Sequence, residues 1–195
     1  MLRCYITDRH QAGGPEPLFA LIQRALEIGV ELIQIREKDW SPRSLSDFVG
    51  RVMRLPNPHA SLVLVNGRPD VALACGAHGV HISSKDMAPS RLREIAPSRF
   101  FIGVSCHSRE DMDRALREDA DYVFVSPVFR PLSKTDERPT LGLEGLRSMV
   151  AGYPIPSFAL GGITSETMAD CIAAGAPGVA GISLFQKYLL IQDNK

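Results

Sequence analysis

The chain has 195 residues, 45% of them hydrophobic, which is enough for one sizeable core and makes one domain the default. Its 22 lysine and arginine residues balance 22 aspartate and glutamate residues, which argues against a general nucleic-acid-binding or anionic-membrane surface. No apolar run approaches the ~20 residues of a membrane span, and the N-terminal segment lacks the pattern of a secretory signal.

Short apolar segments recur along the chain at intervals of roughly 20–35 residues, which predicts β-strands. Several, such as 62–65 and 122–125, are continuous apolar runs. Continuous runs are typical of parallel strands that are covered on both faces. The predicted strands are 2–6, 31–36, 61–66, 79–83, 101–105, 121–126, 156–160 and 177–183.

Helical patterns lie between these strands. Residues 17–28 carry apolar side chains at helical spacing and are followed by Gly29 as a stop signal. Ser41 precedes a proline and begins the next predicted helix. Ser108 is expected to cap a third helix, and Thr164 or Ser165 a later one.

Eight strand–helix units at this spacing predict a compact (β/α)8 barrel, an α/β fold with a single domain over residues 1–195. The alternative is an open doubly wound sheet, which needs a glycine-rich turn after its first strand. Thr7-Asp8-Arg9-His10 follows the first strand instead. The barrel is therefore favoured.

The carboxyl end of the second predicted strand carries a cationic group of side chains. Gln34, Arg36 and Lys38 alternate along the chain and should point to one face. Such a cluster is costly to bury unpaired and suits an anion, with a bidentate Arg36 and a point charge at Lys38 that together match a diphosphate. The alternative is an ion-paired rim in which Glu31, Glu37 or Asp39 neutralises these cations.

The last two strands end in a second phosphate-binding pattern. Gly161-Gly162 would let backbone N–H groups approach a ligand, and Ile182-Ser183 begins a final helix whose N-terminus favours an anion. Barrels often build a phosphate site from these two loops. The alternative is that the glycines only permit tight turns.

Other polar residues after the strands have two interpretations each. Asp86 is a candidate ligand for a divalent cation that bridges phosphate oxygens, or a cap for the helix predicted over 91–95. His107 is either a general base, or a residue that merely precedes the Ser108 cap or packs beneath the helix that Ser108 caps.

The four cysteines, Cys4, Cys75, Cys106 and Cys171, are widely spaced and contain no CxxC pair. This spacing argues against a zinc site or a disulfide framework. Buried thiols in a reducing cytoplasm are expected instead.

Six segments resemble the thiamine phosphate synthase family, in family order across nearly the whole chain. They are QIREK (34–38), VNGRPDVALACGAHGVHI (65–82), IGVSCHS (102–108), ADYVFVSPVF (120–129), FALGGIT (158–164) and GVAGIS (178–183). The resemblance implies a (β/α)8 barrel and a transferase of thiamine biosynthesis. Synthases of this family join hydroxymethylpyrimidine diphosphate to thiazole phosphate and release diphosphate, by a dissociative displacement in which the thiazole nitrogen traps a pyrimidine-stabilised cation.

The resemblance also implies roles for matching residues. Arg36, Lys38, Ser105 and Lys134 are expected to be catalytic, and Asp86 to be one of two carboxylates that bind Mg²⁺. The expected substrate contacts are Gln34, Arg36, Lys38, Asn66, Ser105, Ser133, Lys134, Gly162, Ile182 and Ser183.

The sequence departs from the family pattern at several of these sites. Gly67 occupies the place of the second Mg²⁺-binding aspartate, Ser84 that of a glutamine, and Pro131 and Ser133 those of two threonines. Asn66-Gly67-Arg68 instead looks like the related thiazole tautomerase, although Pro127 stands where that branch has a histidine.

Three functions remain open from the sequence: a synthase, a thiazole phosphate tautomerase, and a non-catalytic binder of thiazole or thiamine phosphate. The expected partners are small phosphate and diphosphate substrates, with neither nucleic acid nor membrane. A homodimer is compatible with the sequence, which does not give the oligomeric state.

Overall fold

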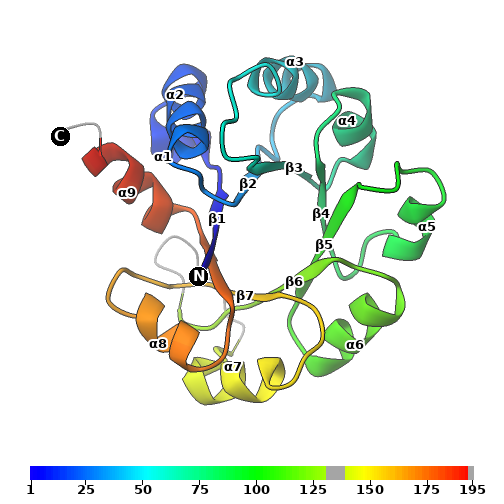
Figure 1. Ribbon diagram of the computed structural model, residues 1–195, viewed down its shortest axis with the longest axis vertical. Helices are drawn as coiled ribbons and strands as arrows, with labels where there is room; N and C mark the ends of the chain where they lie inside the picture. The colour runs from blue at the N-terminus through cyan, green and yellow to red at the C-terminus, as the bar shows by residue number, and fades with distance from the viewer. Residues whose placement is uncertain (131–138, 193–195) are drawn as a thin grey trace.

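A closed barrel of eight parallel strands forms the centre of the computed structural model, which describes residues 1–130 and 139–192. Each strand pairs with the next along the chain, and β8 pairs with β1 to complete the ring. Figure 1 looks down this ring, with the helices arranged around its outside. The predicted (β/α)8 barrel is confirmed, and the open doubly wound sheet is wrong.

Every predicted strand is present, and most are shorter than predicted. The second strand ends at Ile35, one residue early, because the backbone N–H of Arg36 donates to the side-chain hydroxyl of Thr7 instead of continuing the ladder. The strands are β1 (Leu2–Ile6), β2 (Leu32–Ile35), β3 (Leu62–Asn66), β4 (Gly79–Ser83), β5 (Phe101–Cys106), β6 (Tyr122–Val125), β7 (Ser157–Leu160) and β8 (Gly178–Gly181).

Helices follow the strands and pack on the outer face of the ring. The hydroxyls of Ser41 and Ser108 cap their helices as predicted, each by accepting a backbone N–H three residues later. The helices are α1 (Arg9–Ala12), α2 (Pro15–Glu27), α3 (Pro42–Val52), α4 (Pro69–Ala74), α5 (Pro89–Arg93), α6 (Arg109–Arg117), α7 (Gly142–Val150), α8 (Met168–Ala173) and α9 (Ser183–Gln192).

One predicted cap was wrong. The helix after β7 begins at Met168, with Thr167 as its first flanking residue, and not at 164 or 165. The Thr164 hydroxyl accepts the N–H of Thr167 at 3.4 Å, which closes a turn before the helix. Thr164 therefore accepts a backbone N–H three residues later, as a capping residue would, but it does so one turn before the helix begins.

The interior of the barrel is filled by side chains. Large residues from different strands meet there, including Ile6, Leu64, Tyr122, Phe124 and Phe158. The rings of Phe124 and Phe158 meet edge to face with their centroids 5.9 Å apart. A second and larger core lies between the strands and the surrounding helices. The barrel is therefore a packed core that closes the bottom of any site at its rim.

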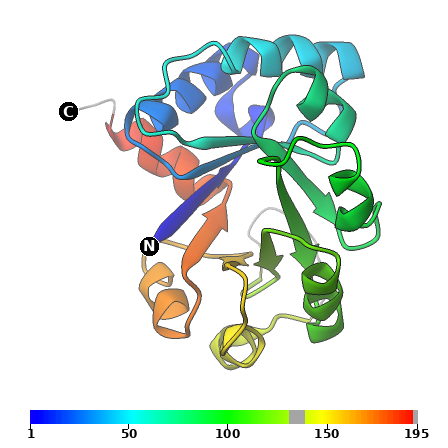
Figure 2. The same cartoon turned by 45° about the vertical axis from the view of Figure 1, so that its right-hand side comes forward.

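The two ends of the described chain lie on one side of the barrel. α9 packs against α2 and β1, as Figure 2 shows. No described helix has the length and apolar character needed to cross a membrane. All four cysteines are free thiols, and Cys4, Cys106 and Cys171 are buried.

Gly103 in β5 faces Tyr122 so closely that no side chain fits. A Cβ at this position would lie 2.0 Å from Cζ and 2.3 Å from the hydroxyl oxygen of Tyr122. The variant Gly103→Ala should therefore lower the free energy of unfolding by about 1–3 kcal/mol through overpacking, as measured by urea denaturation.

Gly50→Ala in α3 is the matched control, because the nearest atom to its Cβ would be 3.8 Å away. Alanine is favoured over glycine in a helix by roughly 0.5–1 kcal/mol, so this variant should be as stable as the parent or more so. Equal losses in both variants would contradict the packing argument.

Candidate functional site

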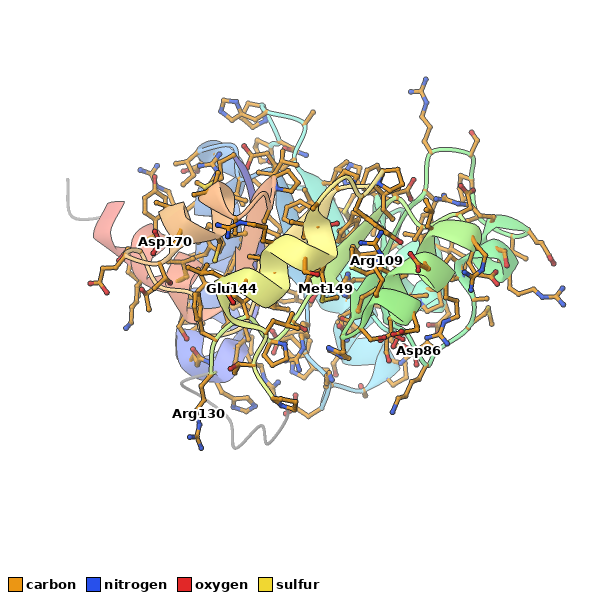
Figure 3. The ribbon with its side chains drawn as sticks, turned by 90° about the horizontal axis from the view of Figure 1, so that it is seen from below. Asp86, Arg109, Arg130, Glu144, Met149 and Asp170 are labelled. Atoms are coloured by element: carbon orange, nitrogen blue, oxygen red, sulfur yellow. The ribbon has the colours of Figure 1, made fainter. Side chains whose placement is uncertain are left out.

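A cavity of about 550 Å³ opens at the carboxyl ends of the strands. In Figure 3, Asp86 and Arg130, which both follow strand ends, lie towards the lower edge of the view. The wall of the cavity contains most of the residues predicted from the sequence, from six different strand ends. These are Gln34, Arg36, Lys38, Asn66, Asp86, Ser105, Gly162, Ile182 and Ser183. The predicted Ser133 and Lys134, and Pro131 beside them, lie outside the described residues.

The side chains of Gln34, Arg36 and Lys38 reach the same cavity, as their alternation predicts. Gln34 is 1% exposed, and its amide Nε2 has no hydrogen-bond partner among the residues that the structure describes. A buried donor without a partner is costly. This unpaired donor belongs to a residue of the cavity wall.

The carboxylates nearest to these cations in the sequence have other partners. Glu31 pairs with Arg3, and both Glu37 and Asp39 pair with Arg9. Within residues 1–130 and 139–192, the Arg36 guanidinium takes part in no ion pair. The ion-paired rim that the sequence left open therefore does not form at Arg36.

His81 in β4 is a cavity residue that the sequence argument missed. It is 2% exposed and stacks on Phe124 with ring centroids 4.2 Å apart. Its Nδ1 lies 2.9 Å from the hydroxyl of Tyr122, and its Nε2 lies 2.8 Å from Oγ of Ser105. The only signal in the sequence was a histidine between apolar strand residues. This signal was too weak to identify the site, because the hydrogen-bond partners of His81 come from two other strands.

The burial of Tyr122 fixes the protonation state of its hydroxyl. Its phenol is 1% exposed, and burial raises its pKa well above the ordinary value, so the hydroxyl keeps its proton. A neutral imidazole carries one ring N–H, so one nitrogen of His81 donates and the other accepts. The bonds to Tyr122 and Ser105 therefore hold the histidine ring in place in either tautomer.

The loops after β7 and β8 form a narrow backbone cradle. Gly161 and Gly162 have φ of 103° and 63°, and a Cβ at Gly162 would lie 2.5 Å from the carbonyl oxygen of Arg130. Both glycines are therefore required by the turn and by the close approach of the chain after β6. This feature supports the turn interpretation, and both glycines also line the cavity.

Ser183 begins α9 at the edge of this cradle. The first N–H groups of a helix have no partner within the helix and carry partial positive charge. The Ser183 hydroxyl donates to Oε1 of Gln11 at 2.7 Å, which fixes the serine against the segment after β1. The cradle is therefore suited to an anion.

Asp86 contributes the acidic side chain in the described wall of the cavity. Its Oδ2 accepts the backbone N–H of Ser83 at 2.7 Å, whereas α5 begins after Ala88 with no side-chain cap, so Asp86 is not the cap of that helix. No group of three or more His, Cys, Asp or Glu side chains in the described part of the chain has the arrangement of a metal site. A single carboxylate beside a phosphate site still fits Mg²⁺, which takes one or two carboxylates and completes its shell with water and phosphate oxygens.

His107 also reaches the cavity, from the end of β5. Its Nδ1 donates to the carbonyl oxygen of Ser126 at 2.7 Å, and its backbone N–H donates to Asp111 at 3.0 Å. The first bond fixes the ring and the second fixes the backbone at the start of α6, and the residue is exposed and does not pack beneath that helix.

Comparison with known proteins identifies the family. The family model described as thiamine monophosphate synthase matches residues 3–185. The chain belongs to the thiamine monophosphate synthase family. It is 39% identical to a thiamine-phosphate synthase of Albidiferax ferrireducens over 93% of this chain and 83% of that protein. It is 37% identical to a thiamine-phosphate synthase of Methanoregula boonei over 93% of this chain and 84% of that protein.

A solved structure supports the same assignment. The thiamine phosphate pyrophosphorylase of Pyrococcus furiosus superimposes with a TM-score of 0.82 at 33% identity, over 96% of this chain and 91% of that one. Two positions that bear on the choice between synthase and tautomerase lie in the described wall. Gly67 adopts φ of 66° with open space around it, and Pro127 follows β6.

The burial of His81 predicts a pH-dependent stability. Burial, and next the nearby charge of Arg36, lower the pKa of His81 from 6.5 to about 3. Below pH 6.5 the unfolded chain binds a proton that the folded protein does not, so the free energy of unfolding falls with pH by about 1.4 kcal/mol per unit. Stability is fully present above pH 6.5 and is progressively lost as pH falls towards 3.

Chemical denaturation of the parent and of His81→Gln between pH 4 and 7 measures this effect. The free energy of unfolding should depend more steeply on pH in the parent than in His81→Gln. The difference in slope corresponds to about one additional proton taken up when the parent unfolds. Carboxylates contribute equally to both curves and cancel in the difference. Parallel curves would contradict the neutral, buried histidine.

Proposed function

We propose that this protein is a thiamine phosphate synthase, which joins hydroxymethylpyrimidine diphosphate to thiazole phosphate and releases diphosphate. One observation carries the proposal. A single cavity has a cationic, donor-rich wall at the end of β2 and a backbone cradle at the start of α9. A reaction between one diphosphate and one monophosphate substrate needs two such anion sites on either side of the reacting atoms.

The first half of the site is proposed to hold the pyrimidine diphosphate. Arg36 and Lys38 bind the diphosphate oxygens, with Lys134 assigned to the same group by its match to the family. Gln34, Asn66 and Ser105 contact the substrate, and a hydrogen bond of 2.8 Å to Nε2 of His81 holds the Ser105 hydroxyl at the cavity wall. These contacts support departure of the diphosphate, because negative charge accumulates on it as the carbon–oxygen bond breaks.

The second half is proposed to hold the thiazole phosphate. The N–H groups near Gly162, Ile182 and Ser183 bind its phosphate, and Ser133 is assigned there by its match to the family. This orientation presents the thiazole nitrogen to the pyrimidine methylene carbon. The new carbon–nitrogen bond forms there as the diphosphate leaves, and the chain acts mainly by positioning the two partners.

Mg²⁺ is the proposed cofactor, with Asp86 as its protein ligand. The ion would supply positive charge to the departing diphosphate. Oδ2 of Asp86 is held by the backbone of Ser83, so the carboxylate is fixed in the cavity wall before a ligand binds.

The proposal predicts that the purified protein makes thiamine phosphate from the two substrates in the presence of Mg²⁺. Chromatography of the product measures this activity.

Arg36→Ala should weaken binding of the pyrimidine diphosphate by roughly 2–4 kcal/mol, because it removes a charge-assisted contact made with two N–H groups. The matched control is Arg51→Ala on α3, where the arginine pairs with Glu16 away from the cavity, and it should retain the activity of the parent.

Absence of product at high enzyme concentration, with a control synthase active, would contradict the synthase. Turnover of a thiazole phosphate tautomer without Mg²⁺ would point to the tautomerase instead. Binding of thiazole phosphate without either reaction would point to a non-catalytic binder. Unchanged affinity in Arg36→Ala would mean that the cluster at the end of β2 is structural.

Replacing Gly67 by aspartate tests the proposed metal site, because an added carboxylate should raise the affinity for Mg²⁺. A Cβ there would meet no atom within 4 Å, and aspartate tolerates left-handed backbone better than most residues. Gly67→Asp should therefore fold and tighten Mg²⁺ binding in the presence of diphosphate by about tenfold, because a second carboxylate joins Asp86. Calorimetric titration measures the change.

Gly67→Asn is the matched control, since it imposes the same backbone conformation without the charge. It should bind Mg²⁺ like the parent protein. Equal affinity in the aspartate and asparagine variants would place the metal away from the neighbourhood of residue 67.

A further inference from the structure

Glu37 is a buried carboxylate next to the cationic wall, and the reaction as described does not use it. Its side chain is 2% exposed. Oε1 accepts the hydroxyl of Thr7 at 2.6 Å, while Oε2 accepts the backbone N–H of Arg9 at 3.2 Å and its guanidinium at 3.3 Å. A carboxylate at this depth requires such partners. All of these partners come from the segment that follows β1.

Thr7 connects this carboxylate to the backbone of the cationic wall. It is fully buried, and its hydroxyl accepts the N–H of Arg36 at 2.8 Å while donating to Glu37. Its own N–H donates to the carbonyl oxygen of Gln34 at 2.9 Å. Thr7, the residue after β1, therefore holds the chain at position 34 within β2 and at positions 36 and 37, which lie beyond the end of that strand.

The same network controls the charge around Arg36. Arg9 pairs with Glu37 and, through both terminal nitrogens, with Asp39. Both carboxylates close to Arg36 in sequence thus have another cation, Arg9, as a partner. The Arg36 guanidinium, which has no ion pair within the described residues, keeps its charge for an anion in the cavity.

We propose that Thr7 and Glu37 are positioning residues for diphosphate binding. Thr7 and Glu37 hold the backbone after β2 so that Arg36 and Lys38 are directed into the cavity before the substrate arrives. This inference rests on the proposed diphosphate site at the end of β2. Preorganisation of this kind strengthens binding because the loop loses less freedom when the ligand binds.

The test compares Thr7→Val, which removes the hydroxyl at nearly constant volume, with Thr7→Ser, which keeps it. Inorganic diphosphate with Mg²⁺ is the calorimetric probe. Thr7→Val should bind it about tenfold more weakly, as expected for the loss of hydrogen bonds that hold the loop. Thr7→Ser should restore the parent affinity. In the synthase assay, the KM for the pyrimidine diphosphate should rise in Thr7→Val, while the KM for the thiazole phosphate stays unchanged.

Ser157→Ala is the matched control, because it removes a buried strand hydroxyl at the opposite end of the barrel. It should lower the melting temperature without changing diphosphate affinity. If Thr7→Val does not fold, Thr7→Ala removes the same hydroxyl with less bulk and is measured instead.

The outcomes separate this inference from the proposed function. If the parent binds diphosphate and Thr7→Val binds it with equal affinity, the positioning role is overturned and the proposed diphosphate site stands. A parent protein that binds no diphosphate would overturn both. A rise in both KM values together, or no recovery in Thr7→Ser, would show a general loss of structure and also overturn the positioning role.

Discussion

Closure of the hydrogen-bonded ring between β8 and β1 is the constraint on which the site depends. Gly178 pairs with Leu2, and the two strands approach so closely that a Cβ at 178 would lie 2.6 Å from the carbonyl oxygen of Leu2. Because all eight strands are parallel and the ring is closed, every strand ends at the same rim. Arg36 and Ser183, from opposite ends of the chain, therefore line one cavity.

The distribution of charge around that cavity follows from the cost of burying ions. The deepest polar side chains at the described wall are neutral: Gln34 is an amide, and burial keeps His81 and its neighbour Tyr122 uncharged, while the buried carboxylate of Glu37 lies outside the wall and is paired with Arg9. Charged groups lie further out, where Lys38 and Asp86 are exposed. The site thus becomes more polar towards solvent, which suits substrates that combine an aromatic ring with phosphate groups.

The sequence predicted the barrel because each strand carries its own signal, a short apolar run between helical patterns. It placed most of the described candidate site residues at one cavity for a related reason: once the strands are parallel, residues after each run must meet. It did not predict His81, whose partners Ser105 and Tyr122 come from β5 and β6. A contact between strands has no signature within the single segment that contains the histidine.

Glu37 illustrates the same limit. From the sequence, it is a candidate partner for the adjacent cations, and nothing local distinguishes this from pairing with Arg9. The choice is made by the ring, which places the segment after β1 beside the end of β2. The start of α8 was misplaced for a different reason, since a threonine caps turns and helices through the same local bond.

The aromatic filling of the barrel has a consequence for how ligands reach the site. Tyr122, Phe124 and Phe158 fill the ring below the cavity, so the described part of the site has an apolar floor. Ligands therefore approach from the rim, where the strands end. A ligand seated against this floor lies beneath whatever occupies the rim, so the depth at which a ligand binds limits its exchange with solvent.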